Sequence, residues 1–260
     1  MKPSQYTVAT MNPAIPYSEI DTLFLDVGNT LISMDYAWVA EELAAHGVPC
    51  EVSALHRAEA AARPLVSAGL ERRSTETEDA FRFYLETVLH CLPGGSDMDP
   101  LQLSKISREL APVLRPAGQA ERLWSSVIPG VPDALISLGK AGVQLAAVSN
   151  SDGTVEEVLV RQNLRSYLSA VYDSQIVGFE KPDPRIFLYA LKDLNADPAR
   201  TLHVGDLYSI DVVGARAAGL HAVLIDPFGD WKDMDCDRVR DLSELSRKIV
   251  AAQKKPIETV

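Results

Sequence analysis

The stretch TLFLDVGNTL, residues 22–31, decides how this sequence can fold. Its first half is mostly apolar, and the apolar run ends abruptly at Asp26, with a glycine two positions later. A continuous apolar run bounded by turn residues is typical of a strand that is buried on both faces of a parallel sheet. Residues 22–26 are therefore predicted to form such a strand, with Asp26 at its carboxyl end.

The same pattern returns four times in the second half of the chain. Apolar runs at 143–148, 170–172, 201–204 and 221–225 are followed by polar or glycine residues, and helix-like stretches lie at 132–140, 154–162, 184–194 and 210–218. Strands that alternate with helices of this length indicate an α/β fold built on a parallel sheet. The sequence thus predicts a Rossmann-like α/β core.

The segment from residue 35 to about residue 125 has a different character. Alanine, leucine, glutamate and arginine dominate it, and apolar residues recur at helical spacing, as at Phe81, Leu85 and Val88. It shows no convincing strand, so we expect four or five helices here, inserted after the first strand and placed over the carboxyl edge of the sheet. The predicted division is a core of residues 1–32 and 126–260, with residues 1 to about 19 as a flexible lead-in, and a helical cap of residues 33–125.

Composition narrows the function classes. The 260 residues carry a net charge of −11, from 25 basic and 36 acidic side chains, which gives no global field for binding nucleic acid or an anionic membrane. No run approaches the ~20 apolar residues that cross a bilayer, and the N-terminus lacks a secretory apolar segment. The three cysteines, Cys50, Cys91 and Cys236, are far apart, so reduced thiols and a cytoplasmic location are expected.

Polar side chains gather at the ends of the predicted strands. In open parallel sheets, ligands bind outside the carboxyl ends of the strands. An acid at a strand end is also a common helix cap, so a single one is weak evidence for a site. Here the combination points to one: the strand-end residues are Asp26, Ser149, Asn150, Asp173 and Asp206, and a lysine, Lys181, lies close to Asp183.

Four motifs around these residues carry a resemblance. They are DVGNTL at 26–31, VSN at 148–150, EKPDPRIF at 180–187 and VGDLYSIDVVGA at 204–215. In this order they resemble the motifs D-x-D-G-T-L, Ser or Thr at a strand end, K-P-x-P-x-x-F and G-D-x-x-x-x-D-x-x-G-A of the haloacid dehalogenase-like (HAD) hydrolase superfamily. The resemblance covers about residues 20–228, and the helical insert resembles that of the subfamily whose cap follows the first strand. It implies Mg²⁺-dependent hydrolysis of a small phosphorylated metabolite.

The resemblance also implies roles for individual residues. Asp26 would be the nucleophile that forms an aspartyl-phosphate, and Lys181 would balance charge on Asp26 and on the phosphoryl group. The residues assigned to Mg²⁺ are Asp26, Gly28 through its backbone carbonyl, Asp206 and Asp211. Those assigned to the phosphoryl oxygens are Thr30, Ser149, Asn150 and Lys181.

One position departs from the family pattern. Two residues after the nucleophile, the family's phosphatases carry a second aspartate that moves protons, and this chain carries Gly28. General acid–base catalysis is worth about 10²–10⁴-fold, so hydrolysis of esters with poor leaving groups, such as sugar alcohols, is expected to be slow. Hydrolysis of acyl or aryl phosphates would be slowed less. Asp35, Tyr36 or a cap residue could substitute, although Asp35 is more readily explained as the cap of a helix from residue 36 to residue 45.

Other functions use the same fold. A binding or regulatory protein with impaired catalysis is supported by Gly28 and opposed by the retained nucleophile. A phosphonate hydrolase needs an early cap lysine, whereas Lys105, late in the cap, is the only lysine between residues 33 and 125. A haloacid dehalogenase needs no metal, and that branch lacks the Gly-Asp pair seen here at 205–206. An exposed apolar cap face would permit a homodimer, but the sequence identifies none.

Two further features are interpreted as structural. His203 lies inside a predicted buried strand, where a hydrogen-bonded core histidine is expected. Arg72 and Arg73, between predicted cap helices, could face a substrate anion but are better explained as a solvated helix end.

Overall fold

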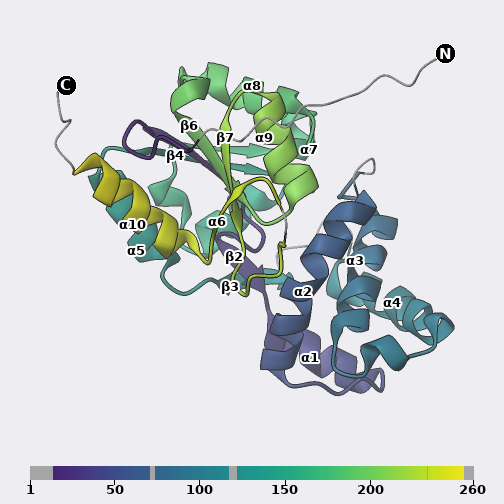
Figure 1. Ribbon diagram of the computed structural model, residues 1–260. Helices are drawn as coiled ribbons and strands as arrows, with labels where there is room; N and C mark the ends of the chain where they lie inside the picture. Colours follow the sequence, from purple (N-terminus) through teal and green to yellow (C-terminus); the bar gives the residue numbers. More distant parts are fainter. Residues whose placement is uncertain (1–13, 71–73, 117–121, 233, 255–260) are drawn as a thin grey trace, which may run out of the picture.

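The computed structural model describes residues 14–70, 74–116, 122–232 and 234–254 (Figure 1). Its centre is a six-stranded sheet with the order β5-β4-β1-β6-β7-β8, in which every neighbouring pair is parallel. The strands are β1 (Thr22–Leu25), β4 (Gln144–Ser149), β5 (Ala170–Asp173), β6 (Thr201–Gly205), β7 (His221–Ile225) and β8 (Asp237–Val239). The five predicted strands are confirmed. β8 was not predicted, because it contains few apolar residues.

Helices cover both faces of this sheet (Figure 1). Along β1 the side chains alternate, so that Leu23 and Leu25 join one apolar cluster and Phe24 joins the other. The first cluster is completed by α5 (Val131–Lys140), α6 (Val155–Arg161) and α10 (Leu242–Gln253), and the second by α8 (Pro184–Leu194) and α9 (Val213–Ala217). The predicted α/β architecture is therefore confirmed.

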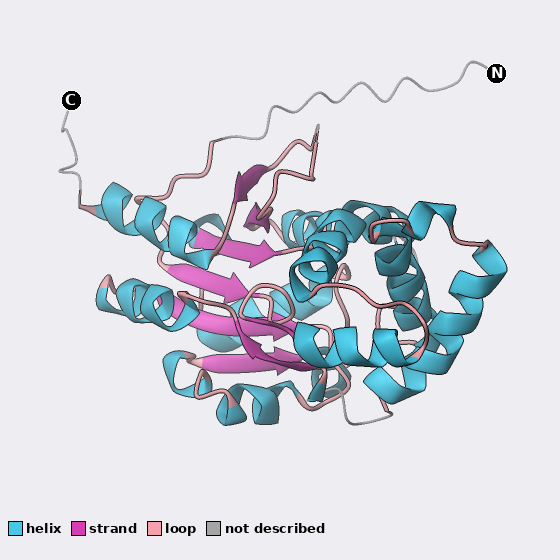
Figure 2. Ribbon diagram, turned by 90° about the horizontal axis from the view of Figure 1, so that it is seen from below, coloured by secondary structure: helices cyan, strands magenta, loops and turns pink. Residues whose placement is uncertain are grey.

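The inserted region is helical, as predicted. It contains α1 (Tyr36–Ala45), α2 (Val52–Leu70), α3 (Glu78–Cys91) and α4 (Pro100–Leu114), with the short 3-10 turn η1 (Gly95–Asp97). These helices have an apolar core of their own, in which Leu55, Leu110 and Leu114 are fully buried. Figure 2 shows that the strand arrows point toward this region, so the helices lie beyond the carboxyl edge of the sheet.

The chain enters and leaves the helical region through two short strands. β2 (Ile32–Met34) and β3 (Trp124–Val127) pair in antiparallel fashion, with Ile32 opposite Val127 and Met34 opposite Trp124. The expectation of no strand up to about residue 125 is therefore wrong at Trp124, because elements of three or four residues are too short to show a period. The predicted limits of core and cap fall inside these two strands.

Two further expectations need correction. The lead-in is not flexible throughout, because Ile15 is buried in the core and the Tyr17 hydroxyl donates to Asp237 Oδ2 at 3.2 Å; residues 1–13 lie outside the described part. The helix predicted at 210–218 is a π-helical segment, η5 (Tyr208–Val212), that continues into α9. The remaining short helical segments are η3 (Arg165–Tyr167), α7 (Ser174–Val177) and η4 (Pro198–Arg200). Within the described ranges, none of the helices combines the length and the apolar character needed to span a bilayer.

Candidate active site

Lys181 joins two acids beyond the carboxyl edge of the sheet. Its Nζ donates to Asp26 Oδ1 at 2.6 Å and to Asp211 Oδ1 at 2.7 Å, and all three side chains are buried. Asp26 follows β1, whose neighbours are β4 and β6, and its backbone N–H donates to the Val204 carbonyl at 2.9 Å. The strand order therefore brings the first, third and fourth sequence motifs to one point.

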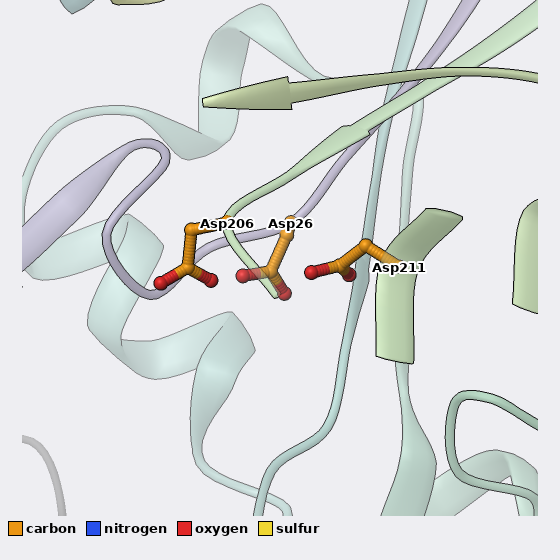
Figure 3. Close-up of side chains that lie close together, drawn as sticks. All are labelled: Asp26, Asp206 and Asp211. Carbon is orange, nitrogen blue, oxygen red and sulfur yellow. The ribbon is translucent and has the colours of Figure 1, made fainter. Parts of the chain in front are cut away.

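Three carboxylates could hold a metal ion at this point. Asp26, Asp206 and Asp211 each offer one oxygen, and these oxygens lie within 4.8 Å of one another (Figure 3). Oxygen donors of this kind are the ligands that Mg²⁺ prefers. Gly28, the fourth predicted ligand through its carbonyl, lies in the turn after Asp26 and lines the same pocket.

The charges of the site also fit a divalent cation. Burial raises the pKa of Asp26, and it raises the pKa of Asp206 to about 8, although Arg63 acts in the opposite direction on Asp206. Among the described residues of the site, the buried carboxylates are Asp26, Glu59, Asp206 and Asp211, and the buried cations are Lys181 and Arg63. When all four acids are ionised, they exceed the two bases by two negative charges, which a bound Mg²⁺ would neutralise.

Asp211 has the opposite electrostatic environment. Burial acts to raise its pKa, but Lys181 and the hydrogen bond from His203 outweigh burial and lower it. Its Oδ1 accepts from Lys181 and contacts His203 Nε2 at 3.0 Å, and its Oδ2 accepts from the Leu207 backbone N–H at 2.9 Å. A Cβ on Gly205 would come within 2.2 Å of the Asp211 carboxyl carbon, so the missing side chain lets this acid lie against the strand end. Asp211 is thus held as the anchor of Lys181.

His203 is both a core residue and a neighbour of the site. It is fully buried, and its Nδ1 lies 3.0 Å from the Phe24 carbonyl oxygen, as expected for a hydrogen-bonded core histidine. Its second nitrogen contacts Asp211, and burial lowers the pKa of the imidazole. Sequence reasoning missed this contact because a histidine inside a buried strand gives no sign of what its ring reaches.

The predicted phosphoryl-binding residues have distinct surroundings. The Asn150 amide clamps the Lys181 backbone: Oδ1 accepts from the Lys181 N–H at 2.7 Å, and Nδ2 donates to the Lys181 carbonyl at 2.9 Å. Asn150 Nδ2 also donates to Thr75 Oγ1 of the helical region at 2.8 Å. Ser149 is buried and lines the pocket, and the buried Thr30 hydroxyl has no hydrogen-bond partner among the described residues. The Asn150 amide therefore acts on the position of Lys181.

Asp173 and Asp35, two other acids considered in the sequence, cap helices. Asp173 Oδ1 accepts from the Gln175 N–H at 2.9 Å at the start of α7. Asp35 Oδ1 accepts from the Trp38 N–H at 3.1 Å at the start of α1, which confirms the predicted cap. Arg72 and Arg73 lie outside the described residues.

A second buried cluster, centred on Glu59 of α2, was not predicted. Glu59 is fully buried and accepts hydrogen bonds from Arg63 Nη2 at 2.6 Å, Asn29 Nδ2 at 3.0 Å, and the hydroxyls of Tyr36 and Tyr84 at 3.1 Å each. We call these five residues the Glu59 cluster. It reaches Asp206, whose Oδ2 accepts from Asn29 Nδ2 at 3.1 Å and lies 3.4 Å from Arg63 Nε. Helical-region charges therefore contact the candidate metal site.

The sequence contained only weak signals for the Glu59 cluster. Glu59 and Arg63 are spaced i,i+4, but this spacing is common on solvent-exposed helix faces and says nothing about burial. Asn29 has φ of 54°, in the left-handed region where asparagine is favoured among non-glycine residues. Its position in the turn after the nucleophile was the one usable clue.

Comparisons with known proteins identify relatives of this chain. A family model described as haloacid dehalogenase-like hydrolase matches residues 20–219. Haloacid dehalogenase-like hydrolase domain-containing protein 3 of Mus musculus is 32% identical over 209 residues, covering 77% of this chain and 79% of that protein. Glyceraldehyde 3-phosphate phosphatase of Methanopyrus kandleri is 28% identical over 205 residues, covering 73% and 88%. The magnesium-bound HAD hydrolase YfnB of Bacillus subtilis has a similar fold, with a TM-score of 0.58 at 19% identity over 88% of this chain and 98% of that chain.

Proposed function

Because this chain belongs to the haloacid dehalogenase-like hydrolase family, we propose that it is a Mg²⁺-dependent phosphatase of a small phosphorylated metabolite. The observation that carries the proposal is the buried Asp26 carboxylate, which accepts from Lys181 at 2.6 Å, sits beside Asp206 and faces a pocket. The relative named glyceraldehyde 3-phosphate phosphatase supports the reaction class. In this proposal residues 33–125 are the cap, and residues 1–32 and 126–260 are the core.

The proposed reaction has two displacement steps. In the first, a carboxylate oxygen of Asp26 bonds to phosphorus while the bond from phosphorus to the ester oxygen breaks, and the departing alcohol takes up a proton. In the second, the oxygen of a water molecule bonds to phosphorus, the bond to Asp26 breaks, and phosphate and a proton are released. Each displacement is easier than direct attack of water on the ester.

The chain's own residues position the reactants. Lys181 offsets the charge of Asp26 and of the phosphoryl group, Asn150 fixes the Lys181 backbone, and the hydroxyls of Ser149 and Thr30 donate to phosphoryl oxygens. Asp26, Asp206 and the Gly28 carbonyl would hold Mg²⁺, with Asp211 behind Lys181. When bound, the ion supplies positive charge that offsets repulsion between the phosphoryl oxygens and the acids.

Gly28 sets the expected limit of this activity. It stands where the phosphatases that the sequence resembles carry their second aspartate, and glycine cannot protonate a leaving group. The enzyme is therefore expected to favour esters whose leaving groups depart without a proton. If that limit were absolute, the same pocket would bind a phosphorylated metabolite without turning it over.

The test is steady-state hydrolysis of p-nitrophenyl phosphate, whose leaving group needs little protonation. We expect turnover with Mg²⁺, and loss of turnover with EDTA and in Asp26→Asn. Asp183→Asn is the matched control: Asp183 caps α8, asparagine caps equally well, and turnover should persist. No turnover above the Asp26→Asn background, in folded protein shown to bind Mg²⁺, would instead support the binding or regulatory interpretation.

A further inference from the structure

The pocket in front of Asp26 has an apolar wall. Its volume is about 180 Å³, and its floor is made by Asp26, Lys181 and Asp206. The aliphatic and aromatic side chains that line the space above this floor include Val66, Leu70, Phe81, Trp124, Val158 and Ile210. Polar residues line it too, among them Thr75, Glu76, Arg115, Ser151 and Thr154. Since a dry apolar cavity of about 150 Å³ accepts benzene, the space suits a phosphoryl group with a leaving group about one ring in size.

The indole ring of Trp124 lies over Gly28. A Cβ built on Gly28 would meet carbon atoms of the Trp124 ring at 3.6 to 3.8 Å, so the indole is already in van der Waals contact with that position. A side chain there would pack beside the ring. An aromatic surface therefore borders the position two residues after the nucleophile, and Trp124 itself comes from β3, where the chain leaves the helical region.

The polar groups that the helical region contributes to this wall already have partners. The Tyr84 hydroxyl donates to Glu59 Oε1 at 3.1 Å, and Arg115 is ion-paired with Glu76. Thr75 Oγ1 donates to Glu76 Oε1 at 3.1 Å and accepts from Asn150 Nδ2 at 2.8 Å. Sugar hydroxyls entering this space would lose water and compete with these existing partners, whereas an apolar group gains by leaving water.

We propose that the substrate is an aryl phosphate, the phosphate monoester of a small, apolar phenol. This inference rests on the proposed phosphatase function and names the substrate class of the same site. Phosphorus bonds to Asp26 as its bond to the phenolic oxygen breaks, and the phenolate leaves with the electron pair of that bond and takes its proton from water. A phenol has a pKa of about 10, as tyrosine does, so its anion is a stable leaving group beside Gly28. An alkanol, whose pKa lies nearer the 15.7 of water, would need the missing proton donor.

Four substrates test separately the two parts of the inference, the need for a good leaving group and the preference for an apolar one. Phenyl phosphate and cyclohexyl phosphate have rings of similar size and differ in leaving-group pKa, whereas acetyl phosphate has a good leaving group with little apolar surface. Glycerol phosphate is polar and has a poor leaving group. We expect kcat/KM for phenyl phosphate to exceed that for cyclohexyl phosphate by at least about 10²-fold, the lower end of what an acid catalyst supplies. We also expect it to exceed that for acetyl phosphate at least tenfold. Glycerol or cyclohexyl phosphate turned over within tenfold of phenyl phosphate would overturn the proposal.

A binding measurement keeps this inference separate from the phosphatase proposal. In Asp26→Asn with Mg²⁺, calorimetry should show phenyl phosphate bound at least tenfold more tightly than inorganic phosphate, and glycerol phosphate no more tightly than inorganic phosphate. Equal affinities would overturn the aryl assignment even if acetyl phosphate is hydrolysed. If no ester is hydrolysed by the unmodified protein, the phosphatase proposal fails, and tight phenyl phosphate binding would still support an aryl-phosphate pocket.

One substitution tests the wall directly. Val66→Thr on α2 keeps the side-chain volume but places a hydroxyl in the apolar wall, and we expect it to lower the ratio of kcat/KM for phenyl phosphate to that for acetyl phosphate about fivefold. Leu65→Thr is the control, because the neighbouring Leu65 is 51% exposed and lies outside the pocket. An equal effect of both substitutions, or no effect of Val66→Thr in folded protein, would contradict the wall's role.

Discussion

The two buried charge clusters of this molecule are built in opposite ways. In one, the cation of Lys181 lies between two carboxylates, those of Asp26 and Asp211, and all three residues belong to the α/β core. In the other, the carboxylate of Glu59 lies at the centre and accepts hydrogen bonds from Arg63, from two tyrosines and from Asn29. The first cluster faces the pocket, whereas the second joins helices α1, α2 and α3 to the turn after β1.

The different arrangements of the two clusters indicate different roles, one in the reaction and one in positioning the helical region. Asp26 has one strong cationic partner, Lys181, and still faces the pocket, so its carboxylate is available for chemistry. The Glu59 carboxylate is surrounded by donors, which satisfies a buried charge and leaves little capacity for a substrate. We infer that the Lys181 cluster serves the reaction and that the Glu59 cluster fixes the helical region over it.

The largest expected effect comes from removing the central cation of the first cluster. Lys181→Met keeps the length of the side chain but leaves Asp26 and Asp211 buried without their shared partner. We expect turnover of p-nitrophenyl phosphate to fall about 10³-fold, comparable to losing a main electrostatic group of an active site. The free energy of unfolding should fall by about 3–5 kcal/mol, as when one partner of a buried pair is removed.

Lys192→Met is the control for this change, because Lys192 is exposed in the last turn of α8. It should alter stability by less than about 0.5 kcal/mol and leave turnover intact. Turnover of Lys181→Met within tenfold of the unmodified protein would show that Lys181 has a structural role alone.

Neutralising the centre of the second cluster should change stability far more than chemistry. Glu59→Gln keeps the shape of the side chain but leaves the Arg63 guanidinium buried without its carboxylate at 2.6 Å. We expect the free energy of unfolding, measured by urea titration, to fall by about 3–5 kcal/mol, while kcat of the folded protein stays within about tenfold. Glu109→Gln, at an exposed pair with Lys105, should cost less than about 1 kcal/mol. A larger loss of kcat than of stability would place Glu59 in the reaction itself.

A smaller effect is expected where the two regions meet. Asn29 Nδ2 donates to both Glu59 and Asp206, so Asn29→Gly removes this bridge while glycine tolerates the positive φ. We expect a loss of about 1.5–3 kcal/mol, the usual value of hydrogen bonds to charged groups. Asn29→Ala should cost about 1 kcal/mol more, because alanine is strained in the left-handed region. If Asn29→Gly unfolds like the unmodified protein, the bridge adds nothing.

The contrast between the clusters also explains what the sequence could predict. Asp26 and Asp206 follow from the rule that parallel strands deliver their carboxyl ends to one edge, whereas Lys181 is assigned from the resemblance of residues 180–187 to a family motif. The structure places the three together. Glu59 and Arg63 could not be found in this way, since burial of a helix face depends on tertiary packing that an i,i+4 spacing does not encode.

Short strands of the fold also could not be predicted from the sequence. The five predicted core strands follow from apolar runs, whereas β2, β3 and β8 have three or four residues each and no run to detect. Trp124 of β3 escaped attention for this reason, although its ring covers Gly28 and forms part of the pocket wall. Apart from the edge strand β8, these missed elements lie where the helical region meets the core.

A change in the pH dependence of stability is also expected. Burial raises the pKa of Asp206 to about 8, whereas an aspartate in the unfolded chain has a pKa of about 3.8. In EDTA, the folded protein therefore keeps a proton that the unfolded chain releases between these values. The unfolding free energy should thus fall as pH rises from 5 to 8. Asp206→Asn removes this proton uptake and should flatten the decline. Some slope should remain, because burial also raises the pKa of Asp26.

Mg²⁺ should counteract the fall of the unfolding free energy with rising pH. An ion that binds the charged form of Asp206 competes with its proton, so Mg²⁺ should stabilise the unmodified protein more at pH 8 than at pH 5. Urea titrations at both pH values, with Mg²⁺ and with EDTA, measure this difference. Asp183→Asn should behave like the unmodified protein, because Asp183 is a helix cap outside the acid cluster. Equal stabilisation by Mg²⁺ at the two pH values would contradict a place for Asp206 in the metal site. An undiminished slope in Asp206→Asn would contradict the raised pKa of Asp206 itself.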